Sequence, residues 1–408
     1  MKKTIAIIGG GASALALATA LDENKFDITI YERHATLGRK FLVAGDGGFN
    51  LTHSEEMGQF ITRYTTNSAN LIYSLRAFSN VNTRTWLKSM GIETFVGSSK
   101  RVFPVKGIKP IQVLNAILTT LKNKNIQLKT RHTWQGWTAQ NELLMSHNDQ
   151  NIVVKADLVV FSLGGASWSK TGSDGLWTRY FEEKNIRIEP FQASNCAYRV
   201  AWSDAFLAQA EGKSLKNIAL KCGDKSQKGE LVITKFGLEG GAIYALSPAI
   251  RQQLKVHHAV TVHLDLKPSS SESELLTKFL QRGNQSISNF LREQLHLSNV
   301  AIGLLKSQLS KPEYTDPEIL VEKLKNLPFS LGVLTDSITA AAPIDEAIST
   351  VGGISQDEID DYFQFKKIPN HYAIGEMIDW DAPTGGYLLQ ACFSMGHYLA
   401  QRLNSSIQ

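Results

Sequence analysis

The sequence has few cysteines. It holds three in 408 residues, Cys196, Cys222 and Cys392, and no two of them form a Cys-x-x-Cys motif. Three scattered cysteines exclude a disulfide framework and a cysteine-rich zinc site, and the missing motif excludes a redox dithiol of the usual spacing. We therefore expect a protein of the reducing cytoplasm. Any redox chemistry of this protein would need a group other than a cysteine pair.

Strong charge and long apolar runs are also missing. The 43 Lys and Arg against 38 Asp and Glu leave a net charge of +5, too small for this length to indicate nucleic-acid binding. No uninterrupted apolar stretch of about 20 residues occurs, so we expect no membrane span. The 10 histidines show no ligand spacing, so we expect no metal site. A small molecule is the predicted partner.

The N-terminal apolar run, residues 5–21, has two interpretations. Behind Met1-Lys2-Lys3 it looks like a signal peptide. However, the glycines at 9–11 would weaken a helical apolar core, and they fall where a strand (5–8) would turn into a helix (12–21). A second strand follows and ends at Glu32, which favours a β-α-β unit.

The turn of this unit matches a dinucleotide-binding fingerprint, Gly-x-Gly-x-x-Ala. Gly9 allows a tight turn, Gly11 lets a pyrophosphate approach the backbone, and Ala14 permits close helix–strand packing. The N–H groups that open the helix would face the phosphates. Glu32 is placed to bind ribose hydroxyls and disfavours a 2′-phosphate, so FAD or NAD is predicted rather than NADP. A purely structural glycine turn is the alternative.

The length suggests two or three domains. Expected elements are a buried strand at 157–163, short strands over 192–243, helices over 274–327 with Asp316 as an N-cap, a helix start at 355–358, a strand at 371–374 and a last helix at 387–403. The simplest division is a dinucleotide-binding α/β domain (1–190 and 340–408), a β-rich insert (191–265 and 328–339) and a helical subdomain (266–327). We see no second Rossmann unit for a nicotinamide cofactor.

Several segments in order along the chain carry a family resemblance. They are Ile5–Leu21, Glu32-Arg33, Gly38-Arg39-Lys40, Asn50-Leu51-Thr52, Arg101–Pro104, Gly164–Trp168, Lys170–Ser173, Gly229–Leu231, Gly237-Leu238, Gly352-Gly353, Gly375–Asp379 and Thr384–Gln390. Together they resemble the BaiN/YhiN-like NAD(P)/FAD-dependent oxidoreductase family of bacterial flavoproteins. The resemblance implies a Rossmann-like FAD-binding domain split by an inserted β-barrel-like domain and a small helical subdomain.

One loop departs from the family pattern. Where the family commonly reads Gly-Gly-Gly-Arg-Cys-Asn-Leu-Thr-Asn, this chain has Gly45-Asp46-Gly47-Gly48-Phe49-Asn50-Leu51-Thr52-His53, without the Arg-Cys pair. That resembles an uncharacterised subgroup. Members of the family have been linked to aminoacetone oxidation and bile-acid reduction. Because the loop would lie near the flavin, the substrate class stays open.

The predicted cofactor-binding residues combine turn glycines, polar side chains and the start of the last helix. They are Gly9, Gly11, Ala12, Ser13, Ala14, Glu32, Arg33, Gly38, Arg39, Lys40, Asn50, Thr52, Gly164, Gly165, Trp168, Gly375, Glu376, Asp379, Gly385, Gly386, Tyr387 and Leu388. The turn before the last helix would place partial positive charge at the flavin N1–C2=O edge. Arg39 and Lys40 would counter pyrophosphate charge, Trp168 would wall the pocket, and Asp379 would meet the ribityl chain or the pyrophosphate.

No catalytic acid or base stands out. His53, at the end of the Asn50–Thr52 segment, is the candidate, and a structural histidine is the alternative. Ser13 does not sit in a Gly-x-Ser-x-Gly elbow, so hydrolase chemistry is not indicated. Flavin chemistry needs no protein nucleophile.

The sequence therefore predicts an FAD-dependent oxidoreductase that transfers hydride between a small organic substrate, amine or enone-like, and flavin N5. The other half-reaction would use O₂ or transiently bound NAD(P)H. One alternative is an NAD-dependent dehydrogenase with the same fingerprint. Another is a non-catalytic flavin-binding module, in one version binding RNA through Lys122, Lys124, Lys129 and Arg131.

Overall fold

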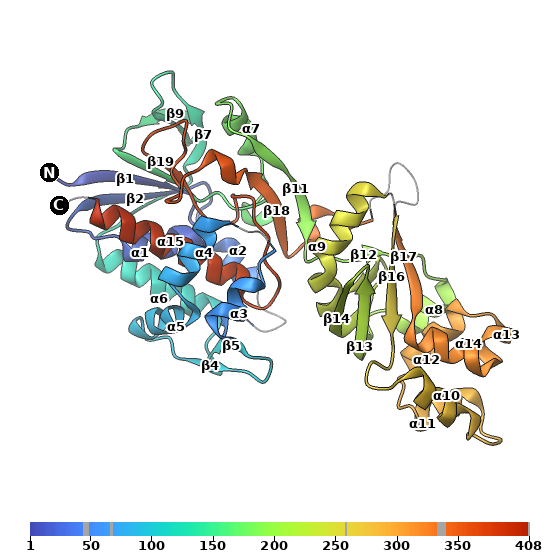
Figure 1. Ribbon diagram of the computed structural model, residues 1–408. Helices are drawn as coiled ribbons and strands as arrows, with labels where there is room; N and C mark the ends of the chain where they lie inside the picture. The colour runs from blue at the N-terminus through green and yellow to red at the C-terminus, as the bar shows by residue number, and fades with distance from the viewer. Residues whose placement is uncertain (44–48, 66–67, 258, 333–339, 407–408) are drawn as a thin grey trace. The chain divides into compact units, whose positions relative to one another are not determined.

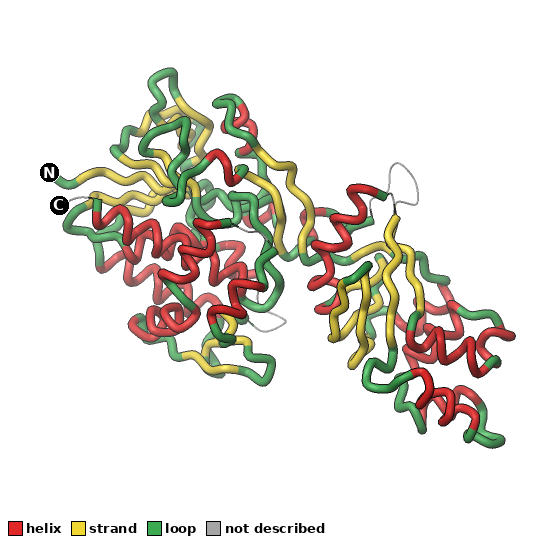
Figure 2. The backbone as a smooth tube through the Cα atoms, viewed as in Figure 1, coloured by secondary structure: helices red, strands yellow, loops and turns green. Residues whose placement is uncertain are grey.

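The chain forms two compact units in the computed structural model, which describes residues 1–43, 49–65, 68–257, 259–332 and 340–406. Met1–Gln192 and Ser349–Gln408 make up the first, which we call the discontinuous unit (Figures 1 and 2). Ala193–Ile348 make up the second, the inserted unit. The three-part division and its boundaries expected from the sequence stay a prediction.

A parallel sheet with strand order β19-β10-β1-β2-β6 is the centre of the discontinuous unit. Its strands are β1 (Lys3–Ile8), β2 (Phe26–Glu32), β6 (Gln127–Thr130), β10 (Leu158–Phe161) and β19 (His371–Ala373). Residues 5–8 of β1 and all of β10 are buried. Their sequences are apolar without a break, which is typical of parallel strands that are covered on both faces. The chain order reverses around β1, and in open α/β sheets ligands commonly bind at such a point, outside the carboxyl ends of the strands.

Helices α1 and α15 lie side by side over this sheet (Figure 1). Gly396 of α15 allows the close approach, because a Cβ there would lie 2.6 Å from the Ser13 carbonyl oxygen. The helices of this unit are α1 (Ala12–Ala20), α2 (Arg39–Val43), α3 (Met57–Thr62), α4 (Ala69–Ala77), α5 (Asn80–Ser89), α6 (Pro110–Asn123), α7 (Thr178–Glu182) and α15 (Tyr387–Ser405), with the 3₁₀ turns η1 (Ser169–Thr171) and η3 (Gln356–Glu358).

Smaller sheets complete the discontinuous unit. One has β5 between β3 and β4, another is the meander β7-β8-β9, and β11 pairs with β18. Their bounds are β3 (Thr52–His53), β4 (Thr94–Val96), β5 (Arg101–Pro104), β7 (Thr133–Trp137), β8 (Leu143–His147), β9 (Gln150–Val154), β11 (Ile188–Ser194) and β18 (Ser349–Ile354). The two-residue strand β3 brings the backbone of Thr52 against Gly386, at the start of α15.

The inserted unit combines an antiparallel sheet of order β12-β15-β14-β13-β16-β17 with helices. Edge strands β12 and β17 contact each other, so the sheet curls toward a barrel. The elements are β12 (Tyr198–Arg199), β13 (Ser214–Cys222), β14 (Lys225–Ile233), β15 (Gly237–Glu239), β16 (Ala259–Asp265), β17 (Leu327–Gly332), α8 (Asp204–Ala210), α9 (Gly241–Val256), α10 (Glu272–Leu280), α11 (Ile287–Glu293), α12 (Asn299–Gln308), α13 (Lys311–Thr315), α14 (Pro317–Lys325) and η2 (Ile344–Glu346). The predicted fold class is confirmed.

Helix-start predictions had mixed outcomes. Asp316 caps α14, accepting the N–H groups of Glu318 and Ile319, as predicted. The helix start at Ser355 is wrong: its hydroxyl accepts a hydrogen bond from Arg187, makes no cap bond, and only the single turn η3 follows. Within the described part of the chain, no helix is long and apolar enough to cross a membrane.

Candidate functional site

The predicted segments meet at the carboxyl edge of the parallel sheet. Gly9 follows β1, Glu32 ends β2, Gly164 comes after β10, and Gly375 comes after β19. Gly9 N–H donates to the Tyr31 carbonyl at 2.8 Å, which joins the turn to β2. A Cβ on Gly375 would lie 2.4 Å from Ser13 Oγ, so the segment after β19 packs directly on the start of α1.

The phosphate turn, residues 9–14, differs sharply between its first and third glycines. Gly9 has φ +98°, and a Cβ there would lie 2.3 Å from the Ser162 carbonyl oxygen. Gly11 has φ −82°, and a Cβ there would meet no protein atom of the described structure within 4 Å. The first helical bond runs from Leu15 N–H to Gly11 O, so the N–H groups of residues 12–14 have no partner within the helix. This open space beside free N–H groups fits a pyrophosphate.

Side chains around the turn hold its shape. Ser13 Oγ lies 2.7 Å from Ser162 Oγ and is buried, so only the backbone of Ser13 remains for a phosphate. Glu32 accepts the N–H groups of Gly10 and His34, each at 2.9 Å, with its two carboxylate oxygens. Glu32 thus braces the turn, and ribose binding stays a prediction. The predicted Ala12 and Ala14 pack in the core.

The predicted basic residues are engaged by distant segments. Arg33 Nη1 lies 2.8 Å from Asp174, and Arg39 donates to the Lys170 carbonyl at 2.8 Å. Gly38 (φ +68°) leads into α2, where both Arg39 and Lys40 lie.

Lys40 forms an ion pair that the sequence did not reveal. Its Nζ lies 2.7 Å from Glu376 Oε2 and 2.9 Å from Ser167 Oγ, and Glu376 also accepts the Thr350 N–H at 3.1 Å. The side chain of Glu376 is 8% exposed. Lys40 is therefore neutralised by a protein carboxylate, whereas Arg39 donates to a backbone carbonyl, which leaves its charge uncompensated by that bond.

The loop after β10 is set by its glycines. Gly164 has φ +74°, its carbonyl accepts the Trp177 indole N–H at 3.1 Å, and a Cβ on Gly165 would lie 2.1 Å from Thr350 Oγ1. Trp168 is not core: it has φ +63° and is 36% exposed. An exposed tryptophan held in the left-handed region is unusual and fits a pocket wall better than a packing role. Asp379, in the segment after β19, accepts the Gly352 N–H at 3.0 Å, and this hydrogen bond joins that segment to β18.

The segment 50–52 and the glycine turn 385–386 form a second focus, which we call the β3–α15 junction. Gly385 and Gly386 have φ of +114° and +96°, and a Cβ on Gly386 would lie 2.6 Å from Thr52 Cα. Asn50 Nδ2 and Thr52 Oγ1 are buried and have no hydrogen-bond partner in the described structure. Buried polar atoms without partners are costly, so this junction fits a polar ligand group such as the isoalloxazine edge. Residues 45–48 of the departing loop lie outside the described residues.

His53 has contacts typical of a structural residue. Its Nδ1 accepts the Glu55 N–H at 3.2 Å, and its ring stacks on Tyr387 with centroids 5.3 Å apart. Burial lowers the pKa of His53, against opposing effects from the Glu55 carboxylate and the Ser99 backbone. The imidazole is neutral at pH 7, and a catalytic role for it stays a prediction.

Sequence reasoning missed a buried charge at the same junction. The side chain of Glu55 is 3% exposed; Arg63 reaches it with Nη2 at 2.8 Å and Nε at 3.0 Å, and the Tyr387 hydroxyl donates to it. Burial raises the pKa of Glu55, but the bonds from Arg63 and Tyr387 outweigh it, and the net pKa is lowered. Burial and the same carboxylate raise the pKa of the Tyr387 hydroxyl. Arg63 is only eight residues from Glu55, but no local pattern could reveal Tyr387, which is 332 residues away. Leu388, next in α15, packs against the core.

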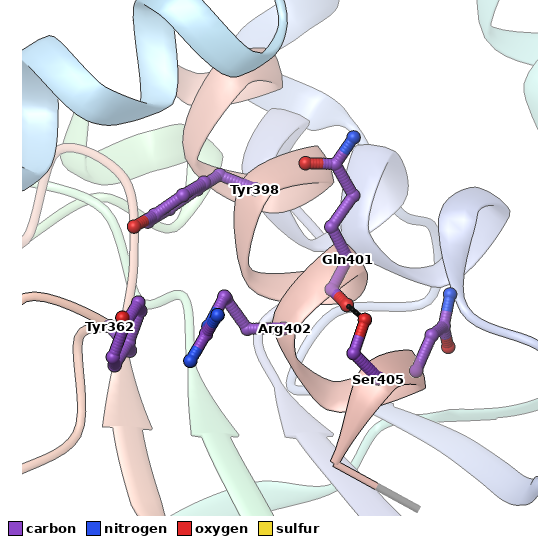
Figure 3. A pocket seen from close by; sticks show the side chains of 6 residues that line it. Tyr362, Tyr398, Gln401, Arg402 and Ser405 are labelled. Carbon is purple, nitrogen blue, oxygen red and sulfur yellow. Dashed lines mark hydrogen bonds between the residues drawn. The ribbon is translucent and has the colours of Figure 1, made fainter. Parts of the chain in front are cut away.

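A depression lies near the opposite end of α15 (Figure 3). Its lining residues are Tyr362, Tyr398, Gln401, Arg402, Asn404 and Ser405. The Arg402 guanidinium lies 3.7 Å from the centroid of the Tyr362 ring. It therefore covers the face of that ring. None of these residues belongs to the predicted site.

Thiol and metal chemistry find no support. All three cysteines are buried, and burial raises the pKa of Cys196 to about 11 and that of Cys392 to about 12, which disfavours thiolates. No group of His, Cys, Asp and Glu in the described residues could hold a metal ion.

Comparisons with a family model and with known proteins both match almost the whole chain. A model of the HI0933-like protein Rossmann domain matches residues 3–402. The 3-dehydro-bile acid delta(4,6)-reductase of Clostridium scindens is 23% identical, covering 98% of each chain. The ribosomal RNA dihydrouridine synthase of Haemophilus influenzae is 21% identical, covering 97% of this chain and 96% of the relative.

Solved structures agree on the fold. The 3-ketosteroid delta1-dehydrogenase of Sterolibacterium denitrificans aligns with a TM-score of 0.53 at 12% identity, covering 99% of this chain and 100% of that one. A flavocytochrome c3 fumarate reductase aligns with a TM-score of 0.50 at 12% identity, covering 99% and 78%. Identities this low establish the fold alone.

Proposed function

This chain belongs to the HI0933-like family, the BaiN/YhiN-like FAD-dependent oxidoreductases, and from that premise we propose that it transfers hydride between FAD N5 and a small enone-like substrate. The observation that carries the proposal is a pair of features in one unit: open space beside Gly11, and buried polar atoms of Asn50 and Thr52 without partners. The first fits the pyrophosphate and the second fits the flavin edge.

The predicted cofactor-binding residues would hold FAD in separate tasks. Gly11 and the N–H groups opening α1 would take the pyrophosphate, with Arg39 adding positive charge. Glu32 would take the ribose hydroxyls while it braces the turn. Asn50, Thr52 and the Gly385-Gly386 turn would meet the isoalloxazine edge. Bound FAD supplies the hydride donor or acceptor, and the protein supplies position and field.

The relatives favour reduction over amine oxidation. The names of both describe addition of hydrogen to a carbon–carbon double bond, in a bile acid and in uridine. An enone-like double bond next to a carbonyl accepts hydride readily, so we place the substrate in this class and keep an amine as the second possibility. NAD(P)H, bound transiently, would reduce the flavin; O₂ is the other partner for the second half-reaction. Buried thiols fit a cytoplasmic setting.

A flavin titration tests the proposal. After incubation with FAD and removal of the unbound flavin, the purified protein should retain the flavin band near ~450 nm, and anaerobic NADH or NADPH should bleach it. An enone such as a 3-keto-4-ene steroid should then restore the band without O₂, while an amine substrate would instead bleach the oxidised flavin directly. No flavin band in the protein after the unbound FAD has been removed would favour the NAD-dependent dehydrogenase, and a band that no reductant or amine bleaches would favour the non-catalytic module.

A second candidate is reduction of uridine in RNA, favoured by the Haemophilus influenzae relative. The basic residues proposed for RNA are partly engaged within the fold: Lys124 lies 3.0 Å from Glu23 and donates to the Leu21 carbonyl, and Lys129 lies 5.8 Å from the Tyr31 ring. We therefore place RNA second. Reoxidation of the reduced flavin by a uridine-containing transcript, but not by the steroid, would reverse this order.

A further inference from the structure

The β3–α15 junction needs something to hold it. Gly385 and Gly386 have no Cβ and adopt positive φ, so the turn has little conformational preference of its own. Its neighbour β3 is two residues long and pairs with β5 through Thr52 and His53, with the Leu51 N–H also donating to the Val102 carbonyl at 2.8 Å. A site that depends on these two segments must fix them relative to each other from outside the turn.

Glu55 bridges the two segments. It lies just after β3, and its carboxylate accepts a hydrogen bond from the hydroxyl of Tyr387, the first residue of α15. Arg63 donates two hydrogen bonds to the same carboxylate, from Nε to Oε1 and from Nη2 to Oε2. Tyr64, next to Arg63, donates its hydroxyl to the Tyr387 carbonyl at 2.7 Å.

The backbone of this segment is also locked. The Asn80 side-chain amide donates to the carbonyls of His53 at 2.7 Å and Glu55 at 2.9 Å. The backbone of Glu55 is therefore held in place, and its carboxylate contacts Tyr387, the residue that follows Gly386.

We infer that Glu55 is a positioning residue for the flavin end of the site. Through Tyr387 it holds the Gly385-Gly386 turn against Thr52, so that the turn and the unpartnered atoms of Asn50 and Thr52 face the ligand together. A buried hydrogen bond to a carboxylate is stronger and shorter than a neutral one, which suits a contact that must restrain a glycine turn. The inference rests on the proposed function, because the ligand is taken to be FAD.

Two variants with a shared target test it. Glu55→Gln removes the charge at constant shape, and Tyr387→Phe removes only the hydroxyl that Glu55 binds. Each should raise the FAD dissociation constant about ten-fold, because Tyr387→Phe removes the hydrogen bond and Glu55→Gln leaves only a weaker, neutral one. The double variant should bind FAD no more weakly than the worse single variant, because both changes act on the same Tyr387–Glu55 contact. Each should also shift the flavin midpoint potential to more negative values, since a looser turn stabilises the reduced flavin less.

Glu142→Gln is the matched control. Glu142 precedes β8 and pairs at 2.7 Å with Lys155, which follows β9, so this ion pair belongs to the β7-β8-β9 meander of the same unit and not to the junction. The variant should leave the dissociation constant and the potential unchanged. These two readouts separate positioning from a general loss of stability, which would change the melting temperature without moving the potential of the flavin that remains bound.

The outcomes are distinct. FAD affinity and potential equal to the parent in folded Glu55→Gln or Tyr387→Phe, or additive effects in the double variant, would overturn the inference while the proposed function stands. Should Glu55→Gln not fold, Tyr387→Phe carries the test alone. A parent protein that binds no FAD would overturn the proposed function, and this inference with it.

Discussion

The phosphate turn and the β3–α15 junction are both proposed to bind FAD, but they are built in different ways. Residues 9–14 are consecutive, and the turn offers backbone N–H groups beside a glycine whose missing side chain leaves space. The junction brings together segments around residues 50–55, 63, 80 and 385–387, and it depends on a buried carboxylate with its partners.

The difference concerns what each region demands of the sequence. A backbone site demands particular residue types at fixed short spacings, because φ and close approach decide it. A side-chain site demands partners, and any acid, base or phenol that the fold brings within reach can serve. Substitutions in each region can test whether the two really depend on these different properties.

Gly9→Ala should have the largest effect. The new Cβ would have to adopt φ +98° and lie 2.3 Å from the Ser162 carbonyl oxygen, so β1 and β10 would have to separate. We expect a loss of at least about 4 kcal/mol in the free energy of unfolding, or no folding. Chemical denaturation of the protein without added FAD measures it.

Gly11→Ala is the matched control within the same turn. Its φ of −82° suits alanine and no protein atom obstructs the Cβ, so the poorer N-cap and the reduced freedom of the unfolded chain should nearly cancel, and the free energy of unfolding should change by less than about 1 kcal/mol. FAD affinity should nevertheless fall at least about ten-fold, because the methyl group would enter the space that we propose for the pyrophosphate. Equal stability losses for the two variants would contradict the contrast between a packing glycine and a ligand glycine.

Lys40→Met probes a buried pair at the edge of the site. It would leave the Glu376 carboxylate, 8% exposed, without its cation, at a cost of about 3 kcal/mol in stability. Lys155→Met is the control: Lys155 also lies 2.7 Å from a carboxylate, but its side chain is 78% exposed, so the free energy of unfolding should hardly change. Thermal or denaturant melts that rank these two variants equally would contradict a role for burial.

Sequence reasoning reached the features that follow local rules and missed the side-chain contacts between distant segments. The β-α-β unit, the turn at Gly9 and Gly11, and the cap at Asp316 follow local rules, and the structure has each where it was expected. The Lys40–Glu376 pair joins residues 336 apart, and the Tyr387–Glu55 bond spans 332. No spacing rule covers such distances. Ser355 failed for the same reason, since a distant Arg187 took the hydroxyl that a local rule assigned to a cap.

Glu32→Ala tests the proposal that Glu32 binds the ribose hydroxyls of FAD in addition to bracing the phosphate turn. It should weaken FAD binding by about 1–3 kcal/mol through lost ribose hydrogen bonds and a loosened Gly10 N–H. Glu32→Gln keeps an acceptor oxygen and should lose less, so the two variants separate the carboxylate charge from the hydrogen bond. Calorimetric titration with FAD gives both values, and unchanged affinity in Glu32→Ala would refute the assigned role.

His397 gives the smallest expected effect and tests the far part of α15, where the helix is held by uncharged packing. Its ring stacks on Phe78 with centroids 3.6 Å apart and meets Trp86 at 5.2 Å. Burial lowers the pKa of His397 to about 3. The folded protein therefore keeps this imidazole neutral while the unfolded chain takes up a proton below about pH 6.5, so stability is lost as pH falls through the window from about 6.5 to about 3.

The expected slope is about 1.4 kcal/mol per pH unit inside that window. His397→Phe keeps the aromatic stack and removes the proton site, so the difference between parent and variant isolates this group from the other histidines. Denaturant unfolding of both proteins at about pH 6 and about pH 5 should show the parent losing about 1 kcal/mol more than the variant. Parallel pH profiles would mean that α15 tolerates charge at this position. The buried environment of His397 would then differ less from the start of the helix, where the Tyr387 hydroxyl donates to the Glu55 carboxylate.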